Sequence, residues 1–203
     1  MNKMLQSFRR QKTSKLYFAA ILAVFFAIYG FTLYQTPKLP PGDPNNAGLV
    51  LPDGFEALAV VDSLKGDARH LAVNSNGDIY VKTRLHALTE GYGNVALRDT
   101  DGDGKADIIT HFNKYESGQY GTAMKIHNGY LYYSSNLIVY RQKLKPGQLV
   151  PDSKVDTIVI DNPPSHSHQT KPLAFDGKGY MYVGWGAGSE VCTNGRPGSI
   201  GAG

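Results

Sequence analysis

Cysteine is almost absent from the chain, which has a single one, Cys192, in 203 residues. One cysteine cannot form a disulfide framework, and no Cys-x-x-Cys-His segment is present for covalent haem attachment. The sequence also lacks the glycine-rich P-loop that holds nucleotide phosphates and the Gly-x-Ser-x-Gly turn of serine hydrolases. These absences exclude a disulfide-stapled domain, a c-type cytochrome, a P-loop enzyme and a hydrolase of that type.

Net positive charge is confined to the N-terminal part of the chain, although the formal net charge of the whole is +4. Residues 1–48 contain six basic residues and one acidic residue, a balance of +5, which leaves about −1 for the rest. Nucleic-acid binding needs lysine and arginine clustered on one face of a folded domain. We therefore predict that nucleic acid is not a partner.

The N-terminal region has the pattern of a membrane anchor. Residues 16–34 carry no charge and are mostly apolar, close to the about 20 residues that a spanning helix needs. Five basic residues in 1–15 precede this run, and Tyr17 and Tyr34 stand at its ends. We predict a single-pass anchor, with a cytoplasmic N-terminus and an extracytoplasmic or periplasmic C-terminal domain. A cleaved signal peptide is the alternative.

Beyond the anchor, the sequence divides into a linker and one folded domain. Residues 35–49 are rich in proline, glycine and asparagine, which is typical of an extended linker. Residues 50–203 show no helical period. Residues 56–61 have strand-like composition, and three later segments share one order: an apolar strand, a glycine turn and an aromatic strand.

The three similar segments recur at nearly equal spacing. The aromatic strands are predicted at 79–82, 130–134 and 180–183, and their tyrosines Tyr80, Tyr132 and Tyr182 are 52 and 50 residues apart. A repeat of short strands near 50 residues predicts an all-β fold, a β-propeller with about three blades in 50–203. A β-sandwich with similar hairpins is the alternative. Closed propellers usually need at least four blades, so we expect further blades beyond Gly203.

An acidic loop is the clearest candidate metal site. Residues 99–107 place four aspartates at loop positions 1, 3, 5 and 9, with glycine at position 6. The candidate ligands are Asp99, Asp101, Asp103 and Asp107. Carboxylates at this spacing are typical of Ca²⁺ loops, but the bidentate glutamate that an EF-hand has at position 12 is replaced by Thr110. We predict a calcium loop of structural role between strands, or else a solvated acidic turn.

Two segments contain candidate catalytic or cofactor-binding residues. His168 is the candidate catalytic base, because a neutral imidazole can accept a proton at physiological pH; a hydrogen-bonding surface histidine is the alternative. Lys171 is the second candidate catalytic residue, placed to stabilise a carboxylate or an oxyanion, or else simply exposed. Arg69 and His70 precede the first apolar strand at the equivalent position. If the strands surround a channel, Arg69 and His70 approach the same end of that channel as the His168 segment, and they are then candidates for cofactor binding. The alternative is that they are ordinary polar turn residues.

The segment from Val50 onward resembles the glucose/sorbosone dehydrogenase family of pyrroloquinoline-quinone (PQQ) enzymes, which are six-bladed β-propellers. The resemblance lies in residues 51–55, in 68–73 with 76–81, and above all in 168–175 followed by 180–183. It implies that His168 is the general base that removes the substrate's hydroxyl proton. Lys171 stands where the family usually has arginine, which keeps the charge and loses the bidentate fork.

The resemblance implies a quinoprotein that oxidises a sugar or a related polyol or aldehyde, with PQQ and Ca²⁺ as cofactors. Most residues that hold the quinone and its calcium are expected beyond Gly203, so we expect the 203-residue chain alone to be inactive. The rival hypothesis is a non-catalytic propeller that binds carbohydrate or a protein.

Overall fold

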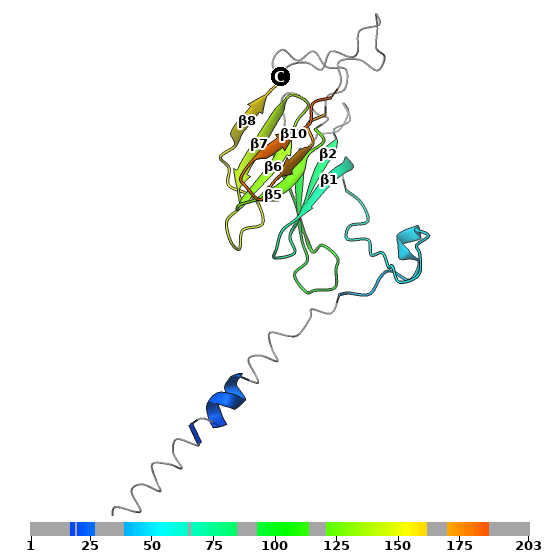
Figure 1. Ribbon diagram of the computed structural model, residues 1–203. Coiled ribbons are helices and arrows are strands. Elements are labelled where there is room, and N and C mark those ends of the chain that lie inside the picture. Colours follow the sequence, from blue (N-terminus) through cyan, green and yellow to red (C-terminus); the bar gives the residue numbers. More distant parts are fainter. Residues whose placement is uncertain are drawn as a thin grey trace, which may run out of the picture. The chain divides into compact units, whose positions relative to one another are not determined.

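The computed structural model describes residues 17–18, 20–26, 39–64, 66–84, 93–113, 121–161 and 170–186 (Figure 1). The chain divides into two compact units, Met1–Leu39 and Pro40–Gly203. In the first unit the described residues 17–18 and 20–26 are helical. The prediction of a single-pass anchor with an extracytoplasmic domain is wrong: within the described ranges, no helix has both the length and the apolar character that crossing a membrane requires.

The second unit consists of antiparallel sheets of four, four and two strands. The first sheet contains β1 (Asp67–Val73), β2 (Ile79–Arg84), β3 (Asn94–Arg98) and β4 (Ile108–Phe112). The second contains β5 (Met124–His127), β6 (Tyr130–Ser134), β7 (Ile138–Lys143) and β8 (Asp156–Ile160). The third pairs β9 (Leu173–Phe175) with β10 (Met181–Val183), and one short 3₁₀ turn, η1 (Asn46–Gly48), precedes them all. In each sheet, strands adjacent in sequence are also neighbours in space. The prediction of a mostly β domain is confirmed.

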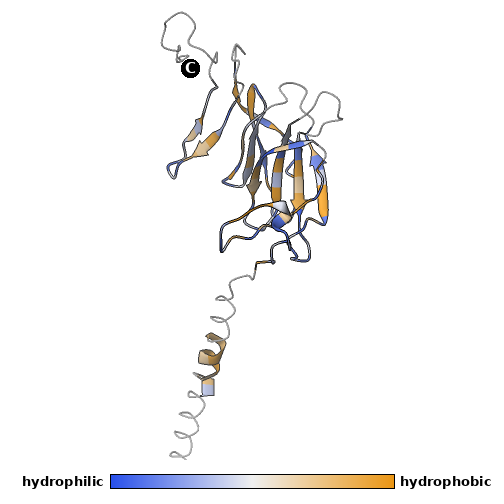
Figure 2. Ribbon diagram, turned by 90° about the vertical axis from the view of Figure 1, so that its right-hand side faces the viewer, coloured by the Kyte–Doolittle hydropathy of each residue, from blue (hydrophilic) through white to orange (hydrophobic). Residues whose placement is uncertain are grey.

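Glycine-containing turns connect the first two strands of each sheet, as the sequence predicts. The turn between β5 and β6 is Asn128-Gly129, with φ of 46° and 75°. Two residues with positive φ form the hairpin turn whose twist matches that of the flanking strands, and asparagine followed by glycine is the pair that tolerates it best. The hairpin is therefore encoded locally. Figure 2 shows hydrophilic residues in the loops and largely apolar strands.

The sheets follow one another through their first strands, with β1 packed against β5 and β5 against β9. The repeated tyrosines lie on the side of each sheet that faces the next one in sequence. Tyr80 is fully buried in a cluster with Met124 and Leu131 of the second sheet. Tyr132 is buried against the third sheet, where its ring meets that of Phe175 at 4.7 Å between centroids. The 50-residue repeat therefore corresponds to a repeated packing contact.

Residues 60–64, which precede the first sheet, lie against its other face, where Val60, Val61 and Leu64 pack on Val81 and Val95. The prediction of a strand at 56–61 is wrong, because these residues join no sheet.

The backbone groups of residues 57–60 form isolated hydrogen bonds rather than the regular series of bonds that joins two paired strands. The Ala57 and Ala59 N–H groups donate to the side chains of Asn46 and Asp43, at 3.2 and 2.8 Å, and the Val60 carbonyl accepts from Ala106 N–H at 2.9 Å. Side-chain acceptors thus replace the partner strand that the sequence pattern suggested.

Candidate functional site

Buried polar residues gather at one end of the sheets, the end at which β1, β5 and β9 begin; we call it the leading end. Of the ten buried polar or charged residues in the described ranges, eight lie there. They are Lys82, Thr83, Asn94, Ser134, Ser135, Asn136, Asp161 and Lys171. Burying such groups costs free energy unless they are paired, so a concentration of them at one end is more typical of a functional region than of a core.

The second and third sheets meet at the leading end in a buried ion pair. Lys171, which precedes β9, places Nζ 2.9 Å from Asp161 Oδ2, and the two side chains are 0% and 6% exposed. Lys171 Nζ also lies 5.1 Å from the ring centroid of Trp185, and the Lys171 N–H donates to Thr122 Oγ1 at 2.9 Å. Asp161 follows β8, and its N–H donates to the Leu137 carbonyl at 2.7 Å. One buried cation therefore connects residues that flank β5, β8, β9 and β10.

The first strand carries Arg69 and His70 at a β-bulge. The register of β1 with β2 shifts between Ala68 and His70, so Arg69 has no directly opposite residue. A bulge turns a side chain away from the regular alternation, and bulges are frequent beside functional sites. His70 stands opposite Lys82. The residues predicted to bind a cofactor thus occupy an irregular position at the leading end, and both are exposed.

Basic groups from three strands influence one another here. Burial lowers the pKa of His70, and the positive charges of Arg69, Lys125 and Lys82 lower it further. Burial also lowers the pKa of Lys82 from 10.5 to about 8, with the charge of Arg69 adding to the effect. Both shifts have the same two causes: first the removal of the group from water, and then the positive charge of nearby basic residues.

The buried amine of Lys82 gives stability a pH dependence. Because the folded pKa lies below the unfolded one, the unfolded chain binds more protons between about pH 8 and 10.5, and the free energy of unfolding rises with pH there. We expect the wild-type value minus that of Lys82→Met to increase by about 2 kcal/mol from pH 7 to pH 10, measured by urea unfolding. Lys178→Met, at an exposed lysine, is the matched control and should give a flat difference. If the difference for Lys82→Met were also independent of pH, the lowered pKa of Lys82 would be contradicted.

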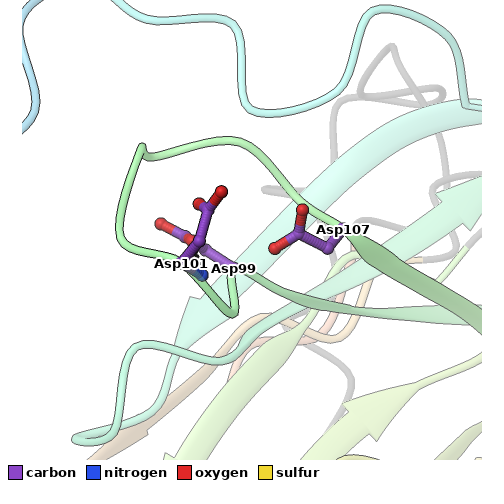
Figure 3. Close-up of side chains that lie close together, drawn as sticks. All are labelled: Asp99, Asp101 and Asp107. Carbon is purple, nitrogen blue, oxygen red and sulfur yellow. Dashed lines mark hydrogen bonds between the residues drawn. The ribbon is translucent and has the colours of Figure 1, made fainter.

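The acidic loop connects β3 to β4, so its flanks are strands, as predicted. Oxygen atoms of Asp99, Asp101 and Asp107 all lie within 4.8 Å of one another, and Figure 3 shows the three carboxylates on the loop. Asp103 is not part of this group; its Oδ1 accepts the Lys105 N–H at 2.7 Å. The structure therefore brings together three of the four predicted ligands.

Backbone donors already occupy these carboxylates. Asp99 Oδ1 accepts the Gly102 N–H at 2.6 Å, and Asp99 Oδ2 accepts the Gly104 N–H at 2.7 Å. Both bonds lower the pKa of Asp99. Hydrogen bonds from the Thr100 hydroxyl and N–H to Asp107 likewise lower its pKa. The carboxylates of Asp99 and Asp107 are held as oriented anions, which suits a cation and also suits an ordered turn without one.

His168, the predicted catalytic base, lies outside the residues that the structure describes. Lys171, predicted as exposed or catalytic, is a fully buried partner of Asp161. Sequence reasoning missed Asp161 and Lys82. Lys82 was recoverable, because it stands two residues after Tyr80 in a strand and so shares its buried face. Asp161 was not, since nothing near it in the sequence identifies its partner.

Comparison with solved structures identifies the kind of fold. The holo form of the pyranose dehydrogenase PQQ domain from Coprinopsis cinerea aligns with a TM-score of 0.55 and 16% identity, over 69% of this chain and 32% of that one. The calcium structure of Trichoderma reesei Carbohydrate-Active Enzymes Family AA12 aligns with 0.56 and 18%, over 77% and 37%. The iodide structure of the same Trichoderma reesei protein aligns with 0.54 and 18%, over 76% and 37%.

These likenesses show the fold: the sheets are arranged as in part of a PQQ domain, and such domains are β-propellers. The chain spans about a third of the length of the solved chains that it matches. No protein-family profile matches the sequence, and no curated protein matches it significantly.

Proposed function

We propose that this chain forms part of a PQQ-dependent oxidoreductase that oxidises a sugar or a related polyol or aldehyde. The observation that carries the proposal is the coincidence of two features. The sheets are arranged as in a PQQ domain, and the leading end gathers basic side chains beside the first strands. Within the described residues, that end is also where the segment containing His168 would join, because Asp161 and Thr170 flank it.

The proposal includes further blades. Tyr182 occupies the position in β10 that Tyr80 and Tyr132 occupy in β2 and β6, yet it is 58% exposed while they are 0% and 7%. An aromatic ring at a repeated packing position indicates a surface that another sheet would cover. We propose that additional sheets complete a closed propeller of about six blades.

The basic residues present fit an anionic quinone. PQQ carries carboxylates, and Arg69 offers an exposed guanidinium that can hold one of them through two parallel hydrogen bonds. His70, with its pKa lowered, supplies a neutral imidazole beside that charge. When bound, PQQ supplies the electrophilic carbonyl that accepts hydride, and Ca²⁺ polarises such a carbonyl.

In this proposal the chain's own residues bind the cofactor and accept a proton from the substrate. His168 accepts the proton of the substrate hydroxyl at its free ring nitrogen, which raises electron density at the carbon that loses hydride. Arg69 and His70 orient the cofactor. Lys171 contributes a buried positive charge next to this segment rather than a direct contact, given its burial against Asp161.

The test is binding and turnover with the intact protein. We expect added PQQ with Ca²⁺ to quench intrinsic fluorescence saturably, and a redox dye to be reduced when sugars are supplied. Arg69→Met should weaken PQQ binding at least tenfold, the loss of one charge-assisted contact. The absence of both quinone binding and dye reduction with every sugar tried would contradict the proposal. Saturable sugar binding without either would favour a carbohydrate-binding propeller.

The acidic loop is proposed as a separate structural calcium site. A ligand that binds only the folded chain raises stability by RT ln(1 + [L]/Kd). We expect millimolar Ca²⁺ to raise the midpoint of thermal unfolding by a few degrees, and Asp99→Asn to abolish that rise. Asp103→Asn is the matched control, because Asp103 stands apart from the other three carboxylates. An equal response of wild type and Asp99→Asn would leave the loop as an acidic turn.

A further inference from the structure

Each of the three sheets repeats one apolar surface on its first two strands, on the face opposite the repeated tyrosine. Successive residues of a strand point to opposite faces, so the residues directly before and after the tyrosine share that other face. Strand pairing places two residues of the preceding strand beside them. We call these four residues the receiving face of a sheet. They are Leu71, Val73, Ile79 and Val81 in the first sheet, Met124, Ile126, Leu131 and Tyr133 in the second, and Leu173, Phe175, Met181 and Val183 in the third.

Within the chain, a receiving face packs on the tyrosine of the preceding sheet. Tyr80 lies in one cluster with all four receiving residues of the second sheet. Tyr132 lies in one cluster with all four receiving residues of the third sheet. The same contact between a tyrosine and a receiving face is therefore made twice, and the two surfaces are complementary.

The described sheets leave one surface of each kind exposed. Tyr182 of the third sheet is 58% exposed, although its counterparts in the other two sheets are buried. On the receiving face of the first sheet, Leu71 and Val73 are 63% and 57% exposed. The first and the third sheet thus carry the two halves of one contact.

Residues 60–64 cover only part of the receiving face of the first sheet. They pack on Val81 in β2 and leave the apolar residues of β1 exposed. Those exposed positions correspond to Met124 in the second sheet and Phe175 in the third, which pack with the tyrosines there. The part that stays open is thus the part that a tyrosine contacts elsewhere in the chain.

The hydroxyl group of Tyr182 does not oppose burial of its ring. It donates to Asp176 Oδ2 at 3.3 Å, within its own sheet. The hydroxyl of the buried Tyr80 likewise has a partner, the Leu149 carbonyl at 2.9 Å. Burial of a polar group costs little when its hydrogen bond is kept. A second sheet can therefore cover Tyr182 without leaving that hydroxyl unpaired.

We propose that a second copy of this chain covers both exposed surfaces: Tyr182 of each copy packs on Leu71 and Val73 of the other. The inference rests on the proposed function for the closed ring of about six sheets. The described residues of one chain form three sheets, arranged as in part of a PQQ domain, so two copies supply six. Contacts between unlike surfaces form a closed ring when the rotation between copies allows it. Two identical contacts, related by a two-fold axis, then complete the ring.

The first experiment measures association of the 203-residue chain without cofactor or sugar. Sedimentation velocity over a range of protein concentrations should show a monomer and a dimer and no larger species. Leu71→Arg and Tyr182→Arg should each raise the dissociation constant by about 100-fold, because each buries a charge in both contacts. Leu49→Arg is the matched control, since Leu49 is an exposed leucine outside the three sheets, and it should leave the dissociation constant within about twofold of wild type.

The second experiment mixes the two variants. Leu71→Arg keeps an intact Tyr182, and Tyr182→Arg keeps an intact receiving face, so a mixed dimer contains one native contact. We expect the mixed dimer to form with a dissociation constant about tenfold or more below that of either variant with itself. Fluorescence energy transfer between one labelled variant and the other measures it.

Four results would overturn the proposal. A wild-type chain that stays monomeric at every concentration would leave the exposed surfaces to further sheets of a longer chain. Association that neither arginine variant weakens would place the contact elsewhere, residues 1–39 included. Variants that fail to pair on mixing would mean that each surface meets its own copy. Assemblies that grow beyond two chains would mean an open filament in place of a ring.

Circular dichroism checks that the variants fold, as expected for substitutions at exposed positions. If Leu71→Arg does not fold, Val73→Arg takes its place in both experiments, with the same expected results. Since neither experiment involves PQQ, a chain that dimerises as expected but binds no quinone would contradict the proposed function and leave the two-copy ring standing. A monomeric chain that binds PQQ would do the reverse.

Discussion

Replacing Leu131 by alanine is expected to lower the free energy of unfolding by about 2–5 kcal/mol. Leu131 is fully buried in β6, in the cluster that joins the first and second sheets, where Tyr80 and Met124 pack around it. Truncation would remove apolar contact and leave a cavity between two sheets that cannot close it without shifting their strands. Urea unfolding monitored by circular dichroism measures the loss.

The matched control for this prediction is Leu49→Ala, because Leu49 is an exposed leucine in the segment before the first sheet. Its effect should fall within about 0.5 kcal/mol of zero. If Leu131→Ala behaved like the control, the contact between the sheets would not be the main source of stability.

The second large effect is expected at His168, as part of the proposed function. His168→Gln should lower kcat with PQQ and sugar by 10²- to 10⁴-fold, the usual contribution of a positioned general base. Glutamine keeps a hydrogen-bonding side chain but cannot take up a proton, so the affinity for PQQ should change little. Steady-state dye reduction and a fluorescence titration with PQQ measure the two quantities.

His166→Gln is the matched control, since the same substitution is made two residues away in the same segment. It should leave kcat within about threefold. Equal losses at both positions would indicate that the segment as a whole matters and that neither imidazole is the base.

The strands were predictable because they are encoded locally. Glycine turns followed by aromatic strands predicted β2, β6 and β10 within two residues of their observed bounds. The error at 56–61 has the opposite origin. That segment has strand composition, but its amides find Asn46 and Asp43, which local composition cannot reveal.

The candidate site was predictable only in part. Residue type and spacing identified Asp99, Asp101 and Asp107, because a loop keeps its ligands close in sequence. Burial of Lys171 was not predictable, since its partner Asp161 follows a strand of another sheet. Charged residues are usually exposed, and only the tertiary structure shows which of them are paired in the interior.

The repeated tyrosines also bear on how the protein is made. Each sheet buries its tyrosine against the sheet that follows in sequence, Tyr80 against the second and Tyr132 against the third. During synthesis, the N-terminal sheet is complete before its cover exists, so every newly made sheet briefly presents an aromatic surface. The sheet that covers this surface is the next one to be synthesised. Folding from the N-terminus onward would keep no more than one such surface open at a time.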